Sequence, residues 1–104
     1  MSYFDVIVLK NAEQDIDEAI AWYEIQKEGL GLRFYMSVQD VLKLLKENPF
    51  LYAKVKQEFR RVLTNGFPYA LFYALDDEKK KVEVVAVIHQ SRNPEYIEKR
   101  LSLE

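Results

Sequence analysis

The chain of 104 residues contains no cysteine and a single histidine, His89. Without thiols it cannot form disulfides or bind zinc through cysteine, and one histidine excludes a histidine-rich metal site within one chain. No apolar run approaches the roughly 18 residues that a membrane-spanning helix needs. The first residues lack the basic segment and small-residue cleavage pattern of a signal peptide. These absences predict a cytoplasmic protein with no metal, no cofactor and no contact with a membrane.

The composition is that of an ordinary soluble domain, with 49% hydrophobic and 31% charged residues. Its length predicts one domain, residues 1–104. The formal net charge is −2, which argues against tight nonspecific binding of nucleic acid. The charge is uneven, because residues 1–50 carry a net charge of −4 and residues 51–104 a net charge of +2. An anionic partner is therefore expected to meet the second half of the chain.

Hydrophobic periodicity predicts an α+β fold. The expected elements are a strand at 3–9, a helix from Asn11 to near Gly29, a helix at 32–47, strands at 58–64, 69–75 and 82–89, and a short helix at 93–101. The two long helices are joined by a glycine-containing corner and predict an αα-hairpin. The three later strands have short connections and predict an antiparallel β-meander. We therefore expect an N-terminal strand, a helical hairpin packed on the meander, and a short C-terminal helix.

The first helix carries carboxylates between its apolar positions: Asp15, Asp17, Glu18 and Glu24. Early acidic residues suit the helix dipole, so we interpret these side chains as a solvated polar face and not as acid–base groups. Asn11, with Gln14 three residues later, predicts an N-terminal cap for the same helix.

A basic stretch begins just before the second predicted strand, residues 58–64, and continues into it. It comprises Lys54, Lys56, Arg60 and Arg61, with Glu58 among them. Neighbouring residues of a strand point to opposite faces, so Arg60 and Arg61 are expected on opposite faces of the sheet. Two interpretations remain open: an anion-binding patch, or an edge strand protected from aggregation by its charges.

His89 follows the apolar run 84–88 directly and lies three residues before Arg92. Histidine can accept or donate a proton near neutral pH, and arginine can hold a phosphate in a fixed fork. A phosphodiester-cleaving site needs both, together with a second base or a tyrosine. The alternative is a histidine at a strand end that bonds to the backbone.

Four segments together resemble the RelE/ParE superfamily of toxins from bacterial type II toxin–antitoxin modules. They are "DIDEAIAWYEIQKEGLGLRF", "ENPFLYAKV", "RRVLTNGFPYALFY" and "VAVIHQSRNPEY". Their order and spacing match over nearly the whole chain, and the family implies the same order of strands and helices. The "WYE" and "GLG" elements are closer to the ParE-like branch, whose members include plasmid stabilisation proteins.

The resemblance implies two alternative targets. ParE-like members inhibit DNA gyrase by protein–protein contact and cause growth arrest, whereas RelE-like members are endoribonucleases that cleave mRNA on the ribosome. The ribonuclease branch is usually strongly basic, whereas this chain is acidic, and we therefore favour a non-enzymatic gyrase inhibitor. The ribonuclease branch also tends to carry a catalytic arginine where this chain has Tyr69, Ala70 and Leu71, and many ParE-like members carry an arginine where Ala70 stands, so the chain departs from both patterns. If the chain is a ribonuclease instead, the resemblance implies His89, Arg61, Arg92 and Tyr96 as its catalytic residues.

The resemblance also implies a cognate antitoxin, which would bind as an extended segment that folds on the toxin. Its acidic part would meet the basic stretch. The candidate contacts for the target or the antitoxin are Lys54, Lys56, Arg60, Arg61, Arg92, Lys99 and Arg100. Family members often pair when isolated from their antitoxin, which implies a homodimer. A decayed toxin that retains only antitoxin binding is a third alternative.

Overall fold

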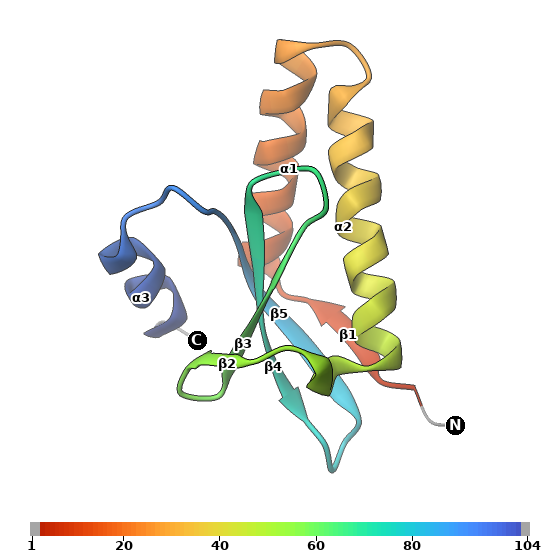
Figure 1. Ribbon diagram of the computed structural model, residues 1–104, viewed down its shortest axis with the longest axis vertical. Helices are drawn as coiled ribbons and strands as arrows, with labels where there is room; N and C mark the ends of the chain where they lie inside the picture. The colour runs from red at the N-terminus through yellow and green to blue at the C-terminus, as the bar shows by residue number, and fades with distance from the viewer. Residues whose placement is uncertain (1–2, 103–104) are drawn as a thin grey trace.

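A computed structural model describes residues 3–102, which fold into a five-stranded sheet with helices on both faces (Figure 1). The elements are β1 (Asp5–Val8), α1 (Lys10–Gln26), α2 (Leu30–Glu47), the 3-10 turn η1 (Pro49–Leu51), β2 (Lys54–Lys56), β3 (Phe59–Leu63), β4 (Tyr69–Asp76), β5 (Lys81–His89) and α3 (Pro94–Ser102). The predicted α+β class and the order of its main elements are confirmed. Among the described residues, none of the helices is both long and apolar enough to cross a bilayer.

The strand order in the sheet is β1-β5-β4-β3-β2. The antiparallel meander of β3, β4 and β5 was predicted from the short connections between them. The sequence did not predict that β1 pairs with β5 in parallel, or that β2 adds a short edge strand. The parallel pair needs a long crossover, and the α1–α2 hairpin supplies it.

Apolar side chains fill both faces of the central strands, which explains why β4 and β5 are apolar at nearly every position. The hairpin covers one face, where Phe34, Leu71 and Tyr73 are fully buried. The opposite face holds Phe72, Ile88 and their neighbours, and α3 covers part of it through Leu101. In Figure 1 the sheet lies between the hairpin and α3. We call the face under α3 the open face.

The "WYE" and "GLG" elements of the sequence build the corner of the hairpin. The carboxylate of Glu24 accepts hydrogen bonds from the backbone N–H groups of Gly29 and Gly31, each at 3.0 Å, and so satisfies two donors at the start of α2. Gly29 has φ of +87°, the left-handed region that glycine tolerates best. Gly31 lies inside α2, not in the turn, and a Cβ there would be 2.7 Å from the backbone oxygen of Ile20. These residues therefore serve helix packing.

The predicted cap of α1 at Asn11 is wrong. The helix begins one residue earlier, at Lys10, with Leu9 in the extended N-cap position and no side-chain hydrogen bond. The N–H of Leu9 still donates to the carbonyl of Val84 on β5. The chain passes directly from sheet pairing into the helix, and this leaves no room for a side-chain cap before Asn11.

Two hydrogen bonds attach the segment after α2 to the sheet. The hydroxyl of Tyr73, on β4, donates to the carbonyl of Pro49 at 2.6 Å, and the guanidinium of Arg60 donates to the carbonyl of Tyr52 at 2.6 Å. Burial raises the pKa of Tyr73 to about 12, and the nearby Arg60 partly offsets this effect. Tyr73 is therefore a neutral donor in the folded state up to strongly alkaline pH.

We expect stability to fall as the pH rises from 10 to 12. The folded-state pKa of Tyr73 lies above its ordinary value of 10.0, so the unfolded chain loses this proton first and is favoured over that interval. The loss from this group is up to about 3 kcal/mol. Urea unfolding at pH 8, 10 and 11.5 tests it. Tyr73→Phe should lose about 1–2 kcal/mol at pH 8 and show a shallower alkaline decline, whereas equal slopes in both proteins would contradict the assignment.

Candidate functional site

A bulge in β5 determines where His89 points. Tyr73 pairs with Val84 and Phe72 pairs with Ala86, so Val85 is an extra residue on β5. Val84 faces the hairpin, and simple alternation would place His89 on the open face. The extra residue reverses the alternation. His89 therefore shares the hairpin face with its cross-strand partner Tyr69, and their rings lie 5.1 Å apart.

The Nδ1 atom of His89 is bound within its own loop. It accepts a hydrogen bond from the backbone N–H of Ser91 at 3.0 Å and lies 2.8 Å from the Ser91 hydroxyl. This arrangement places the imidazole proton on Nε2. The carbonyl of His89 also accepts from the N–H of Arg92 at 3.0 Å. The histidine thus organises the turn between β5 and α3, in agreement with the backbone-bonded alternative.

Beyond this turn, four side chains from two helices and the loop form a connected group. The Arg92 guanidinium lies 3.7 Å from the centre of the Tyr96 ring, close enough for a cation–π interaction. The Tyr96 hydroxyl accepts a hydrogen bond from Arg100 at 2.9 Å. Arg100 donates two further bonds to the carboxylate of Asp15 on α1, at 2.6 and 3.0 Å. We call Asp15, Arg92, Tyr96 and Arg100 the α3 cluster.

The predicted role of Asp15 as part of a solvated polar face is wrong. Its side chain is only 16% exposed and that of Arg100 15%, so Asp15 does not belong to a solvated polar face. Its carboxylate also accepts the N–H of Val87 at 3.0 Å, on the edge of β5 beyond the point where β1 ends. The bond to Asp15 raises the pKa of Arg100, against the opposing effect of burial. No local pattern signals this role, because Asp15 and Arg100 are far apart in sequence.

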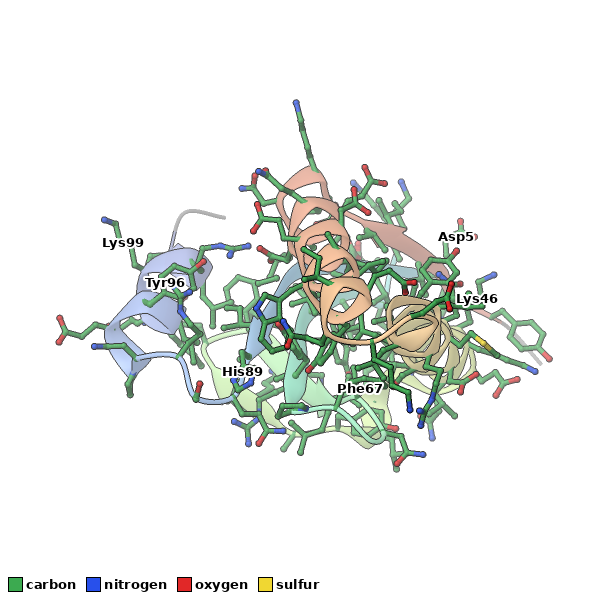
Figure 2. The ribbon with its side chains drawn as sticks, turned by 90° about the horizontal axis from the view of Figure 1, so that it is seen from above. Asp5, Lys46, Phe67, His89, Tyr96 and Lys99 are labelled. Carbon is green, nitrogen blue, oxygen red and sulfur yellow. The ribbon has the colours of Figure 1, made fainter. Side chains whose placement is uncertain are left out.

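Tyr69 contacts the ring of His89, and two members of the α3 cluster, Asp15 and Arg92, influence the pKa of Tyr69. Burial is the main reason that its pKa is raised, nearby Tyr23 and Asp15 raise it further, and Arg92 lowers it. Tyr69 is therefore a neutral phenol at physiological pH, packed among aromatic rings of the hairpin face. Figure 2 shows His89 between Phe67 on one side and Tyr96 of α3 on the other.

The basic stretch is only partly available for binding. Lys54 pairs with Glu58 at 3.2 Å, and Lys56 pairs with Glu98 of α3 at 3.1 Å. As predicted, Arg60 and Arg61 point to opposite faces. Arg60 bonds to the segment after α2, whereas Arg61 lies exposed beside Phe72 on the open face. Between residues 3 and 102, Arg61, Arg92 and Lys99 form no ion pair with a carboxylate within 4.0 Å.

The structure brings together some of the predicted catalytic residues and separates others. Arg92 and Tyr96 are in contact, and a hydrogen-bonded turn connects His89 to Arg92. Arg61 lies on the other face of the sheet from His89. Among residues 3–102, no cluster of three or more His, Asp or Glu side chains is close enough to hold a metal ion.

A hairpin packed on a twisted sheet, with a small C-terminal helix on the other face, is the architecture of the RelE and ParE toxins. A family model described as "ParE toxin of type II toxin-antitoxin system, parDE" matches residues 6–94. The chain belongs to this ParE toxin family. It is also 25% identical over 96 residues to Toxin ParE2 of Mycobacterium tuberculosis. The aligned region covers 91% of this chain and 90% of that protein.

Solved structures show the same fold. The RelBE2 toxin–antitoxin complex of M. tuberculosis superposes with a TM-score of 0.63 at 18% identity, over 84% of this chain and 98% of the matched chain. The isolated RelE toxin of E. coli gives a TM-score of 0.60 at 20% identity, over 99% of this chain and 100% of that chain. At these identities the likeness concerns the fold alone, so the target of this chain has to be argued from its own residues.

Proposed function

We propose that this toxin inhibits DNA gyrase by protein–protein contact and that a cognate antitoxin neutralises it. The family membership supports a toxin of a type II system. One observation supports contact over RNA cleavage: the bulge at Val85 turns His89 to the hairpin face, while Arg61 stays on the open face. The four residues implied for a ribonuclease do not face a common substrate position.

The individual contacts of these residues agree with that proposal. A general base has to reach the proton that it removes at about 2.6–3.2 Å, directly or through one water. His89 already uses Nδ1 for Ser91, and the Tyr96 hydroxyl is bound by Arg100. Both side chains therefore already have hydrogen-bonding partners within the chain.

The target-binding surface that we propose contains three of the seven candidate contacts, Arg61, Arg92 and Lys99, which form no ion pair with a carboxylate of residues 3–102. Lys54, Lys56, Arg60 and Arg100 contribute less, since each bonds to another part of the chain. For the antitoxin we propose an acidic, partly apolar segment that folds against the basic stretch. Exposed Leu63 beside Arg61 suits such a segment.

A supercoiling assay with purified gyrase tests the proposal. The wild-type protein should inhibit supercoiling, and His89→Ala should inhibit equally well. Arg61→Ala should raise the concentration for half-inhibition roughly fivefold, which corresponds to about 1 kcal/mol of contact energy. Lys54→Ala is the matched control, because Lys54 already pairs with Glu58, and it should behave as wild type.

A translation assay run beside it measures whether the protein cleaves mRNA on the ribosome, and such cleavage would contradict the proposal. Ribosome-dependent mRNA cleavage that disappears in His89→Ala would establish the endoribonuclease alternative. Inhibition of neither gyrase nor translation, with antitoxin binding intact, would identify a decayed toxin.

A further inference from the structure

The backbone of Arg92 is fixed at the start of α3. The N–H of Arg92 donates to the carbonyl of His89 at 3.0 Å and closes the turn that leaves β5. Asn93 follows and caps α3, since its side-chain oxygen accepts the N–H of Glu95 at 2.6 Å and its carbonyl accepts the N–H of Tyr96 at 3.0 Å. Arg92 therefore has a defined position between a closed turn and a capped helix.

The Tyr96 ring, which contacts the Arg92 guanidinium, is itself held in place. The ring packs against the apolar cluster of the open face. Its hydroxyl accepts a hydrogen bond from Arg100 at 2.9 Å, and Arg100 donates two bonds to Asp15. A chain of contacts thus runs from α1 through α3 to the Arg92 guanidinium, which lies 3.7 Å from the centre of the ring.

The hydrogen-bond donors of the Arg92 side chain are free. Within residues 3–102, the arginine side chains that donate hydrogen bonds are those of Arg60 and Arg100, and Arg92 forms no ion pair within 4.0 Å. Stacking on a ring uses the flat face of a guanidinium and leaves the N–H groups at its edge available. Because Arg92 is exposed, a partner can reach these N–H groups.

The charges near Arg92 suit one carboxylate better than a chain of phosphates. Binding of a nucleic-acid backbone needs several cations, each of which neutralises a phosphate. On α3, Arg100 is already paired with Asp15, and exposed Glu95 adds a negative charge in the first turn. Lys99 is the second unpaired cation of this helix. A single carboxylate needs only one guanidinium, which holds it through two parallel N–H···O bonds.

We propose that Tyr96 is a positioning residue, which presents the Arg92 guanidinium to a carboxylate on the surface of gyrase. The inference rests on the proposed function, because it names the chemical group that the target offers. An arginine loses conformational freedom when it binds, and stacking on a fixed ring removes part of that loss beforehand. Within residues 3–102, Arg61 has no such ring contact. Arg92 should therefore contribute more to binding than Arg61.

A double-mutant cycle in the supercoiling assay tests whether Tyr96 acts through Arg92. Arg92→Ala should raise the concentration for half-inhibition about tenfold, and Tyr96→Leu, which removes the ring, about fivefold. The double variant should again show about tenfold, since without the guanidinium the ring has nothing to position. Tyr96→Phe, which keeps the ring, should recover most of the inhibition that Tyr96→Leu loses.

Two results of this cycle would overturn the proposal. A double variant that shows the product of the single effects, about fiftyfold, would mean that Tyr96 acts independently of Arg92. An Arg92→Ala protein that inhibits as well as wild type would mean that no carboxylate of gyrase binds there. Loss of ribosome-dependent mRNA cleavage in Arg92→Ala, in place of gyrase inhibition, would identify a phosphate as the ligand and would also overturn it.

Nuclear magnetic resonance without gyrase separates failure of this inference from failure of the proposed function. The Tyr96 ring should shift the Arg92 side-chain signals upfield, and Tyr96→Leu should abolish this shift. With sodium acetate as the carboxylate probe, the Nε–H signal of Arg92 should reach half of its change at a concentration about threefold lower than that of Arg33, because its guanidinium is held in place. Arg33 is the matched control, an exposed arginine on α2.

The two kinds of failure give different results. A protein that shows both resonance effects without inhibiting gyrase would overturn the proposed target. Unshifted Arg92 signals, or equal acetate responses of Arg92 and Arg33, would overturn positioning by Tyr96 even if gyrase is inhibited.

Discussion

Replacing Asp15 with alanine is expected to lower the free energy of unfolding by about 3 kcal/mol, the lower end of the range for breaking a buried ion pair on one side, because the pair with Arg100 is partly buried. The change leaves the partly buried Arg100 guanidinium without the carboxylate to which it donates two hydrogen bonds, at 2.6 and 3.0 Å. The N–H of Val87 loses its acceptor as well. The loss of stability should be large because Asp15, on α1, accepts hydrogen bonds from both β5 and α3.

Urea unfolding of three variants measures this effect. Asp17→Ala is the matched control, because Asp17 is an exposed carboxylate on the same helix, and it should change stability by less than about 0.5 kcal/mol. Adding Arg100→Met to Asp15→Ala should recover part of the loss, since no charge then remains buried without a partner. Equal stability of the Asp15 and Asp17 variants would show that the ion pair does not attach α3.

Replacing Gly31 with valine is expected to cost about 3 kcal/mol, at the upper end for overpacking a core. A Cβ at this position would lie 2.7 Å from the backbone oxygen of Ile20 and 3.0 Å from the Glu24 carboxylate. The clash is with backbone, so α1 and α2 have to separate. The helix preference of a larger residue offsets only about 1 kcal/mol.

Thermal unfolding of a short series distinguishes this clash from loss of glycine as such. Gly31→Ala should fall between wild type and Gly31→Val. Gly66→Ala is the control for backbone strain, because Gly66 has φ of +85° and open space around it, and it should cost about 1–2 kcal/mol. A Gly31→Val protein as stable as Gly66→Ala would contradict the close approach of the two helices.

Local patterns in the sequence were enough to predict most of the elements. The helical spacing of Ala12, Ile16 and Ala19 predicted α1, and these residues are buried as expected. The apolar run at 69–75 predicted a central strand, and β4 lies at the centre of the sheet. The parallel pairing of β1 with β5 was not predictable in this way, because it depends on contacts between segments about 75 residues apart.

The site was less predictable than the fold for two physical reasons. The direction of His89 depends on one extra residue in β5, and alternation along the sequence gives the wrong face for it. The pairing of Asp15 with Arg100 depends on where α3 docks after the sheet has formed. The opposite orientations of Arg60 and Arg61 were predictable, since they follow from alternation within one regular strand.

The most direct test of gyrase inhibition by contact is pulse labelling in a bacterial host within minutes of induced expression, with wild type and His89→Ala side by side. DNA synthesis should stop first in both, with filamentation and DNA-damage signalling, while protein synthesis continues. An immediate loss of protein synthesis with intact DNA synthesis, absent in His89→Ala, would contradict the proposal and assign the histidine a catalytic role in mRNA cleavage.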